Sequence, residues 1–461
     1  MQQLLAITLL TWKAALRFRL FLVVAVLLLA SVVGLPILIK DDGTARGFTQ
    51  ILLTYTLSTI TGLLGLSTLW LACGTLARDI EECQMQMVAV KPIARWQIWL
   101  GKWLGIMSLN AALLAISGAS IFVLLQWRAN RLPADEQKIL RNEIMVARGS
   151  ATVDKQEKEI EEKTDELLKE RLRKTPVTKA DLNEVRKQLR EQVKAEYQVV
   201  PPGYSRVWQI NLGMAKNSLR DRPLQLRVKF NSADKSPSGT FDGVWRLGIP
   251  RKTEAWQSEV MSLAPDTFHE FEIPANLFDE NGTLTITFLN PNNTSLLFPI
   301  EDGMEVLYRQ GGFGTNFIRG LGIVFCWMGV LAALGLAAAS FLSFPVAAFV
   351  ALGVLTLVAC SGTMANAVSE GGLGGYNAEK GGHTNLPIDV VALPVFKGIL
   401  FVINLAKEFS PIDSLSTGRM ISWEQLGKAF GQIVIVLGGL LAVIGILVFN
   451  RRELATAQGT Q

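Results

Sequence analysis

The sequence predicts an all-α polytopic membrane domain of six transmembrane helices with an inserted extracytoplasmic α+β domain. Most of residues 20–126 and 315–450 is apolar, in runs of about 20 residues that can cross a bilayer. Residues 128–312 have ordinary soluble composition, first with helical periodicity and then alternating with period two. The net charge of +5 lies largely at the flanks of the spans and gives no reason to expect nucleic-acid binding.

The first span is predicted at residues 20–39. This apolar run is too long for the core of a signal peptide. Basic residues precede it and keep the amino terminus in the cytoplasm, because basic flanks of spans stay on that side. They are Lys13, Arg17 and Arg19. The second and third spans are expected at residues 51–76 and 101–125, which completes a first membrane segment of residues 1–127.

A charged cytoplasmic loop, residues 77–100, is expected between the second and third spans. The stretch around it carries Arg78, Lys91, Arg95 and Lys102 against Asp79, Glu81 and Glu82. An ion inside the hydrocarbon costs about 2.5–3.5 kcal/mol even on a mild insertion scale, so this stretch is expected outside it. Its basic residues place it in the cytoplasm.

The order of residues in this loop resembles the permeases of type-2 ABC exporters. Acidic residues after a span are followed by Lys91-Pro92-Ile93-Ala94-Arg95 and by a Gly101-Lys102 step that opens the next span. The resemblance implies that the loop forms a short coupling helix that binds a separate ATPase subunit. The residues that it assigns to this contact are Arg78, Asp79, Ile80, Glu81, Glu82, Lys91 and Pro92. An ordinary charged connection between two spans is the alternative.

Small and hydroxyl-bearing residues form a stripe on each of two spans. They are Thr54, Ser58 and Thr61 on the second span, and Thr356, Cys360 and Thr363 on the fifth. Their spacing of three and four residues puts each set on one helical face, where small residues let helices pack closely. The resemblance implies a second interpretation, in which these two spans line a substrate route between two permease copies.

Residues 128–200 are predicted to form an extracytoplasmic helical stalk. Apolar residues recur every seven positions from Val153 to Leu167, which is typical of a helix with one narrow apolar seam. Pro176 ends this helix, and a second helix is expected after it. Acidic and basic residues balance in residues 134–197, which is typical of a solvated face and argues against a polyanion-binding arm.

Residues 201–312 are predicted to form an antiparallel β-sandwich. Apolar residues alternate with polar ones, for example in residues 224–230 and 284–288, and polar turn clusters separate these runs. Sandwiches of this kind often bind carbohydrate, and three tryptophans are candidates for a stacking platform, with core packing as the alternative. They are Trp208, Trp245 and Trp256. Residues 128–312 as a whole are the region expected to meet an extracytoplasmic partner.

Residues 313–461 complete the membrane domain with the last three spans. The fourth and sixth are expected at residues 316–341 and 426–449, and the fifth ends near Asn366. Between the last two spans lies an extracytoplasmic loop, residues 367–425. A short apolar segment within it, residues 391–405, is expected to be re-entrant or interfacial.

The carboxyl-terminal tail adds to the resemblance. Type-2 permeases of the copper-enzyme-maturation and gliding-motility kind show a similar order of residues before and after the last span. The matching residues are Ser410-Pro411-Ile412-Asp413, Gly418 with Ile421, and Arg451-Arg452. The two final arginines place the carboxyl terminus in the cytoplasm.

The chain carries no sequence motif for catalysis, so it is not expected to be an enzyme by itself. It lacks GxxxxGK[ST], so ATP and Mg²⁺ are expected on the partner ATPase subunit and no cofactor is expected in this chain. Four cysteines and two histidines are scattered, without the spacing of a metal site or a disulfide framework.

The sequence therefore predicts a permease subunit in a bacterial cytoplasmic membrane, with both termini inside. It would work with a second permease copy and ATPase subunits to move an unknown substrate. One alternative is an ATP-driven signalling module that acts on an extracytoplasmic partner without transport. The other is an intramembrane enzyme, which the scarcity of histidine and of paired acids within the spans disfavours.

Overall fold

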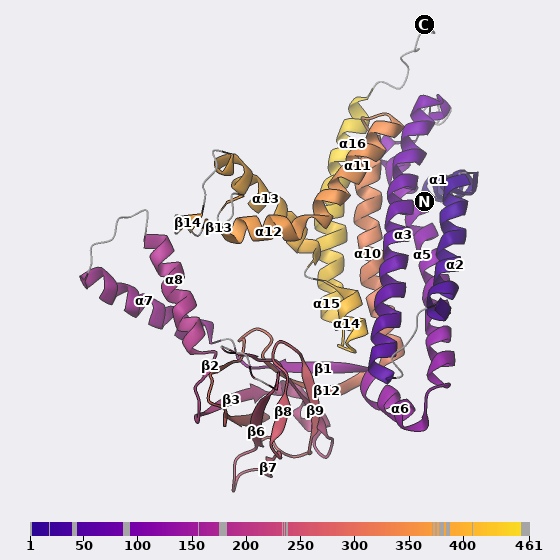
Figure 1. The fold of residues 1–461 in the computed structure, drawn as a ribbon. Helices are drawn as coiled ribbons and strands as arrows, with labels where there is room; N and C mark the ends of the chain where they lie inside the picture. Colours follow the sequence, from indigo (N-terminus) through magenta and orange to yellow (C-terminus); the bar gives the residue numbers. More distant parts are fainter. Residues whose placement is uncertain are drawn as a thin grey trace. The chain divides into compact units, whose positions relative to one another are not determined.

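The computed structural model divides the chain into two compact units (Figure 1). The helical unit comprises Met1–Ala147 and Gly311–Gln461, and the insert unit comprises Arg148–Gln310. The structure describes residues 2–17, 19–38, 44–85, 93–154, 156–174, 182–232, 234, 236, 238–370, 372–373, 376–377, 382–383, 388–407 and 409–452.

Among the described residues, five helical segments are long and apolar enough to cross a membrane. They are α3 (Ala45–Glu81), α5 (Arg95–Ala129), α10 (Phe313–Ala339), α13 (Asp389–Lys407), and the run of α15 (Trp423–Ala429), η3 (Phe430–Gly438) and α16 (Gly439–Arg451). Counting two bent helix pairs as one span each raises the number to seven. The chain therefore has the make-up of a multi-pass membrane protein, and the order of six spans stays a prediction. Shorter elements of this unit are α6 (Ala134–Ile139), η1 (Leu140–Ile144), α14 (Pro411–Ser416), β13 (Tyr376–Asn377) and β14 (Gly382–His383).

Two pairs of helices are bent at a short break. One joins α1 (Gln2–Arg17) to α2 (Arg19–Leu38), and their axes differ by 78°. The other joins α11 (Phe344–Ala359) to α12 (Ser361–Glu370) at 49°, with the break at Cys360. The 16 residues of α11 extend about 24 Å, less than the roughly 30 Å of a hydrocarbon core. The fifth span predicted through residue 366 is thus bent at Cys360, as a broken span or a re-entrant loop.

Helix α1 has no counterpart among the predicted spans, and it packs closely along α5. A Cβ on Gly101 would lie 2.8 Å from Ile7 Cβ, and one on Gly105 would lie 2.6 Å from Thr11 Cβ. Real Cβ atoms do not approach this closely, so the two glycines allow the contact. Ile7, Thr11 and Ala15 are the buried residues of α1 and recur at a spacing of four. That spacing is a sequence signal for an amphipathic helix.

Helices α3, α5 and α10 form the centre of the helical unit. Leu64, Ile106 and Leu336, one from each helix, are fully buried in a continuous apolar core. Helices α3 and α10 approach so closely that a Cβ on Gly335 would lie 2.6 Å from Ala72 Cβ. Close contact over small residues is how helices gain packing energy in a bilayer, where no hydrophobic difference separates a helix from lipid.

The insert unit contains an antiparallel sandwich. In the described strands, one sheet has the order β1-β12-β4-β9, the other has β3-β10-β6-β7 with β8 beside β6, and β2-β11-β5 form a small third sheet. The strands are β1 (Val146–Thr152), β2 (Val199–Val200), β3 (Ser205–Asn211), β4 (Leu224–Val228), β5 (Asn231–Ser232), β6 (Phe241–Leu247), β7 (Trp256–Gln257), β8 (Met261–Leu263), β9 (His269–Ile273), β10 (Thr283–Leu289), β11 (Leu296–Leu297) and β12 (Met304–Gly312), with η2 (Gly213–Ala215) and α9 (Lys216–Leu219) between β3 and β4.

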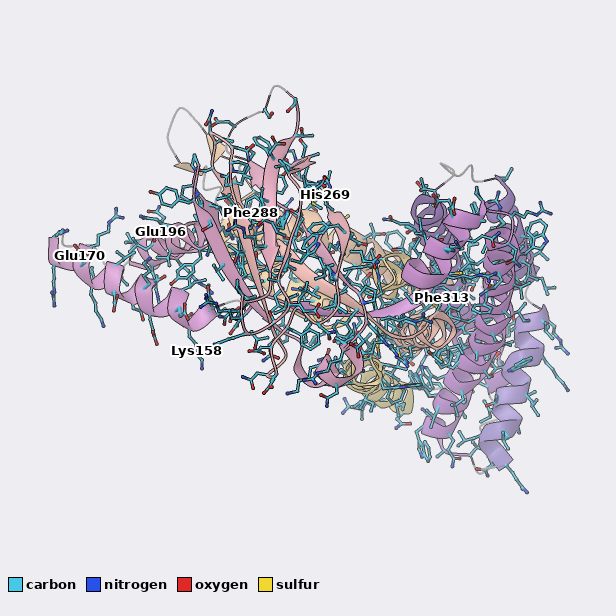
Figure 2. The ribbon with its side chains drawn as sticks, turned by 90° about the horizontal axis from the view of Figure 1, so that it is seen from below. Lys158, Glu170, Glu196, His269, Phe288 and Phe313 are labelled. Atoms are coloured by element: carbon cyan, nitrogen blue, oxygen red, sulfur yellow. The ribbon has the colours of Figure 1, made fainter. Side chains whose placement is uncertain are left out.

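The sandwich core is aromatic and contains one of the three tryptophans proposed as a binding platform. Trp245 is 0% exposed, and its ring centroid lies 4.6 Å from that of the buried Phe288, which is labelled among the strands in Figure 2. Trp208 packs edge-on against Phe298 at 5.2 Å, and Trp256 stacks on Phe271 at 6.4 Å. The alternating strands thus place these rings in and against the core. A shared platform that includes Trp245 is wrong, because this ring does not reach solvent.

The predicted stalk is only partly helical. Helices α7 (Glu157–Lys174) and α8 (Leu182–Glu196) pair through Asp165 with Arg186 at 2.9 Å and Lys163 with Glu196 at 2.8 Å. Residues 146–152, placed in the stalk by the sequence, instead form strand β1 of the sandwich. Val153 also packs against the sandwich core. The predicted heptad pattern was thus wrong at its first position, because Val153 packs against the sandwich and not in the apolar seam of a helix.

Candidate coupling site

The residues assigned to a coupling helix lie in the last turn of α3. Arg78, Asp79, Ile80 and Glu81 continue that helix without a break, and Glu82 caps it with an N–H that donates to Arg78 O at 2.8 Å. Arg78 to Glu81 are thus part of α3, and the chain turns at Glu82 and Cys83, where Cys83 has a positive φ of 57°. Gln84 and Met85 are helical again, so a short helix within the connection stays a prediction. Lys91 and Pro92 lie outside the described residues.

Asp79 binds a lysine of the neighbouring helix α5. Lys102 is 5% exposed, and its Nζ donates to Asp79 Oδ2 at 2.5 Å and to Thr75 O at 2.9 Å. An unpaired ammonium in such a place would lose several kcal/mol of hydration energy, so the carboxylate and the carbonyl stabilise it there. The sequence-based assignment missed Lys102 as a partner, although it is the one charged residue between Arg95 and Arg128 of α5.

Arg78 and Glu81 contact the start of α11 instead of extending away from the protein. Glu81 Oε1 accepts a hydrogen bond from the Phe344 N–H at 2.8 Å. The Arg78 guanidinium lies 4.6 Å from the centroid of the Phe344 ring, within the range of a cation–π contact. The carboxylate thus meets one of the N–H groups that have no partner within their own helix.

Two arginines bind the carboxyl ends of helices at the same end of the unit. Arg95 Nη1 donates to Phe449 O at 2.7 Å and to Asn450 O at 2.8 Å, at the end of α16. Arg452 Nη1 donates to Ser340 O at 3.2 Å, just beyond α10. A guanidinium is favourable here because the last carbonyls of a helix lack partners and carry partial negative charge. The ends of α3, α5, α10, α11 and α16 are therefore joined by charged side chains.

Ile80 packs into the protein itself. It is half-buried and lies against the apolar core of the helical unit. Its side chain therefore already has an apolar environment within this chain, and its assignment to the ATPase contact stays a prediction. The exposed residues described at this end lie in the α3–α5 connection or next to it. They are Glu81, Glu82, Cys83, Gln84, Ala94 and Trp96.

The stripe on α3 serves packing in part. Thr54 and Thr61 are half-buried, and Ser58 is exposed. Further along the same face, Thr68 Oγ1 donates to Asn110 Oδ1 of α5 at 3.0 Å. This hydrogen bond between two buried side chains supports the packing interpretation for the part of the stripe nearest the charged end.

The stripe on the fifth span is divided by the break between α11 and α12. Thr356 precedes the break, Cys360 forms it and Thr363 follows it, and all three are exposed. An apolar groove of about 510 Å³ does lie between α2, α3 and α11. None of the predicted path residues lines it; its walls include Leu66, Trp70, Phe344, Ala348, Phe349 and Leu352. The structure therefore does not bring the two stripes together around this groove.

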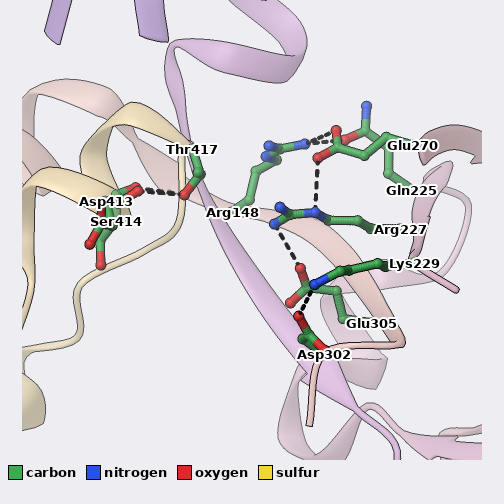
Figure 3. Close-up of polar contacts among 10 residues, drawn as sticks. All are labelled: Arg148, Gln225, Arg227, Lys229, Glu270, Asp302, Glu305, Asp413, Ser414 and Thr417. Carbon is green, nitrogen blue, oxygen red and sulfur yellow. Dashed lines mark hydrogen bonds and ion pairs between the residues drawn. The ribbon is translucent and has the colours of Figure 1, made fainter. Parts of the chain in front are cut away.

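A second charged cluster lies on the sheet β1-β12-β4-β9 of the insert unit (Figure 3). Arg148 pairs with Glu270 at 3.0 Å, and Arg227 pairs with Glu305 at 2.9 Å, so each of the four strands contributes one charge. The Arg227 guanidinium also lies 3.8 Å from the centroid of the Phe268 ring. The two positive and two negative charges balance, which is typical of a cluster that fixes strands to one another.

The remaining sequence candidates have structural roles or lie outside the described side chains. His269 Nε2 lies 2.7 Å from Ala264 O and 3.0 Å from Thr267 Oγ1, which holds a turn of the sandwich. His383 lies in β14, where its side chain is not described. Within the described part of the chain, no three His, Cys, Asp or Glu side chains gather in a way that could hold a metal ion.

Comparison with known proteins adds no relative: no family model, no curated protein and no solved structure matches this chain.

Proposed function

We propose that the chain is the transmembrane permease subunit of an ATP-driven ABC exporter of the type-2 class. The proposal rests on the resemblance of residues 76–105 and of the tail to that class, and on the multi-pass make-up of the helical unit. The protein would lie in a bacterial cytoplasmic membrane with both termini inside, paired with a second permease copy. ATP and Mg²⁺ would be bound by separate ATPase subunits, since this sequence lacks a phosphate-binding loop.

The observation that carries the proposal is the junction at the ends of α3 and α5. Charged side chains there join five helix ends, so a force applied to the α3–α5 connection would reach several spans at once. ATP binding would draw the ATPase subunits together, pull on this connection and open the substrate path to the other side of the membrane.

Trp96 is the residue best suited to anchor the ATPase subunit. It is 46% exposed at the start of α5, beside the connection. Tryptophan is enriched among the few residues that dominate protein–protein affinity, because it buries a large rigid ring. Trp127, near the other end of α5, is 49% exposed and serves as a matched control. The two rings are 31 positions apart, or about 46 Å along the helix, so Trp127 lies far from the connection.

The proposal predicts that Trp96→Ala weakens capture of the ATPase subunit about thirtyfold, which corresponds to an anchor worth roughly 2 kcal/mol. Trp127→Ala should leave capture unchanged. The measurement is the affinity of the detergent-purified chain for its ATPase subunit, with ATP hydrolysis by the complex followed in parallel. Equal capture by both variants and the wild type would remove Trp96 as an anchor, and the absence of any ATPase partner for the wild type would refute the permease proposal.

The insert unit supports a second candidate, an ATP-driven signalling module. Helices α7 and α8 form a charge-balanced pair attached to the sandwich through Lys194 and Glu301 at 2.7 Å. Such a body could transmit motion to an extracytoplasmic partner without transport. ATP hydrolysis that is stimulated by a partner protein, and by no small solute, would favour this second candidate.

A further inference from the structure

We infer that Asp79, Glu81 and Lys102 are positioning residues that connect the end of α3 to two different spans, α5 and α11. This inference rests on the proposed function, since it concerns how motion of the α3–α5 connection would reach the membrane helices. It changes the role of the two carboxylates, which the resemblance assigns to contact with the ATPase subunit.

The connection to α5 consists of a buried charge with a directional partner. Lys102 Nζ reaches both a side-chain oxygen of Asp79 and the backbone oxygen of Thr75. Moving α3 along α5 by one residue would separate the ammonium from these oxygens. Because breaking a buried ion pair leaves one charge without compensation, the pair resists such sliding and fixes the register of the two helices.

The connection to α11 consists of a helix cap supplied by another helix. In the described structure, Ser343 occupies the cap position of α11 without making a side-chain cap hydrogen bond. Glu81 supplies the missing acceptor by binding the Phe344 N–H. A carboxylate at this place is also favoured by the partial positive charge at the amino end of a helix. Arg78 adds a contact to the Phe344 ring from the same turn.

The geometry of α3 separates these two connections. Positions two apart on an α-helix point about 200° away from each other, so Asp79 and Glu81 face opposite sides of the last turn. One carboxylate therefore contacts α5 and the other contacts α11. A displacement of this turn pulls on both spans, while the ATPase subunit meets the exposed residues beyond it, such as Glu82 and Trp96.

The test separates binding of the ATPase subunit from transmission of its motion. The full permease–ATPase complex is studied in two cysteine backgrounds, both with Cys83→Ser. Cys360, which is exposed at the end of α11, reports on α11. The exposed position 115, as Ala115→Cys with Cys360→Ser, reports on α5. A nitroxide spin label is attached to each reporter thiol in detergent, and the readout is the change in its electron paramagnetic resonance spectrum on adding ATP and vanadate.

We expect Glu81→Ala to reduce the nucleotide-dependent change at Cys360 about fivefold or more and to leave that at position 115 unchanged. The double variant Asp79→Asn with Lys102→Met removes both charges together, so neither is left buried alone. It should reduce the change at position 115 by a similar factor and spare Cys360. All variants should elute as intact protein and capture the ATPase subunit as well as the wild type.

Three results would overturn the inference. Loss of ATPase capture in these variants would make the carboxylates contact residues. A spectral change as large as that of the wild type in every variant would make the two connections passive. A wild-type complex that shows no nucleotide-dependent change would do the same. If the wild type captures no ATPase subunit at all, the proposed function fails first, which is a separate outcome.

Discussion

At the scale of single residues, the chain relies on glycine where helices meet and on charge where they end. Gly101 and Gly105 let α1 lie against α5, while Asp79 and Lys102 join α5 to α3. The sequence identified the acidic residues of the α3 end but not their partners. Lys102 was placed only by its charge and by its position at the start of a span. Its role depends on which helix face turns inward, and tertiary packing decides that.

Gly105→Ala should destabilise the helical unit by about 1–3 kcal/mol, since overfilling a packed contact forces neighbours apart. The added Cβ would lie 2.6 Å from Thr11 Cβ, an atom next to the backbone that cannot move away freely. Gly62→Ala in α3 is the control, because a Cβ there would have no neighbour within 4 Å. The thermal midpoint of the purified chain measures both, and equal midpoints would show that α1 does not pack here.

At the scale of elements, the long apolar helices were predicted well, but the break between α11 and α12 and the strand β1 were not. The centres of α3, α5, α10 and the last span follow from hydropathy alone. The break at Cys360 could not be predicted, because Thr356 to Thr363 contains no proline and its single glycine, Gly362, lies after the break. Strand β1 was missed because its pairing partner, β12, lies about 150 residues further along the chain.

The attachment of α8 to the sandwich should depend on pH. The hydrogen bond from Lys194 lowers the pKa of the Glu301 carboxyl below its ordinary value of 4.5. A depressed folded-state pKa contributes stability above the unfolded-state value, and this contribution is lost as pH falls through the folded-state pKa. The protection of residues 182–196 against amide hydrogen exchange, taken relative to the intrinsic rate at each pH, should therefore fall below about pH 4.5. The loss of opening free energy should be less than about 1 kcal/mol, because the ion pair reaches solvent.

Matched variants separate this ion pair from general effects of acid on the insert unit. Lys194→Met should show the raised exchange already at neutral pH and lose most of its pH dependence. Lys174→Met removes an ion pair with Glu170 that lies within α7 alone, so it should leave exchange in residues 182–196 unchanged. Identical exchange in Lys194→Met and the wild type would show that α8 is held by its apolar contacts only.

At the scale of the whole molecule, the proposed function requires the α3–α5 connection and the insert unit to lie on opposite sides of the membrane. The α3–α5 connection must lie where ATPase subunits are found, in the cytoplasm, and the insert unit must lie outside. The positive-inside rule supports this orientation from the sequence. The division into a helical unit and a separate insert unit is found in the structure, while the side on which each lies follows from charge alone.

Cysteine labelling in intact cells tests this orientation most directly. Cys83 is exposed beside the connection, and Ser238 lies in the insert unit. With Cys360→Ser as background, two chains are compared, one with Cys83 as its exposed thiol and one with Cys83→Ser and Ser238→Cys. A membrane-impermeant maleimide should label position 238 in intact cells and Cys83 only after permeabilisation. The reverse pattern would place the connection outside, out of reach of any ATPase subunit, and would contradict the permease account.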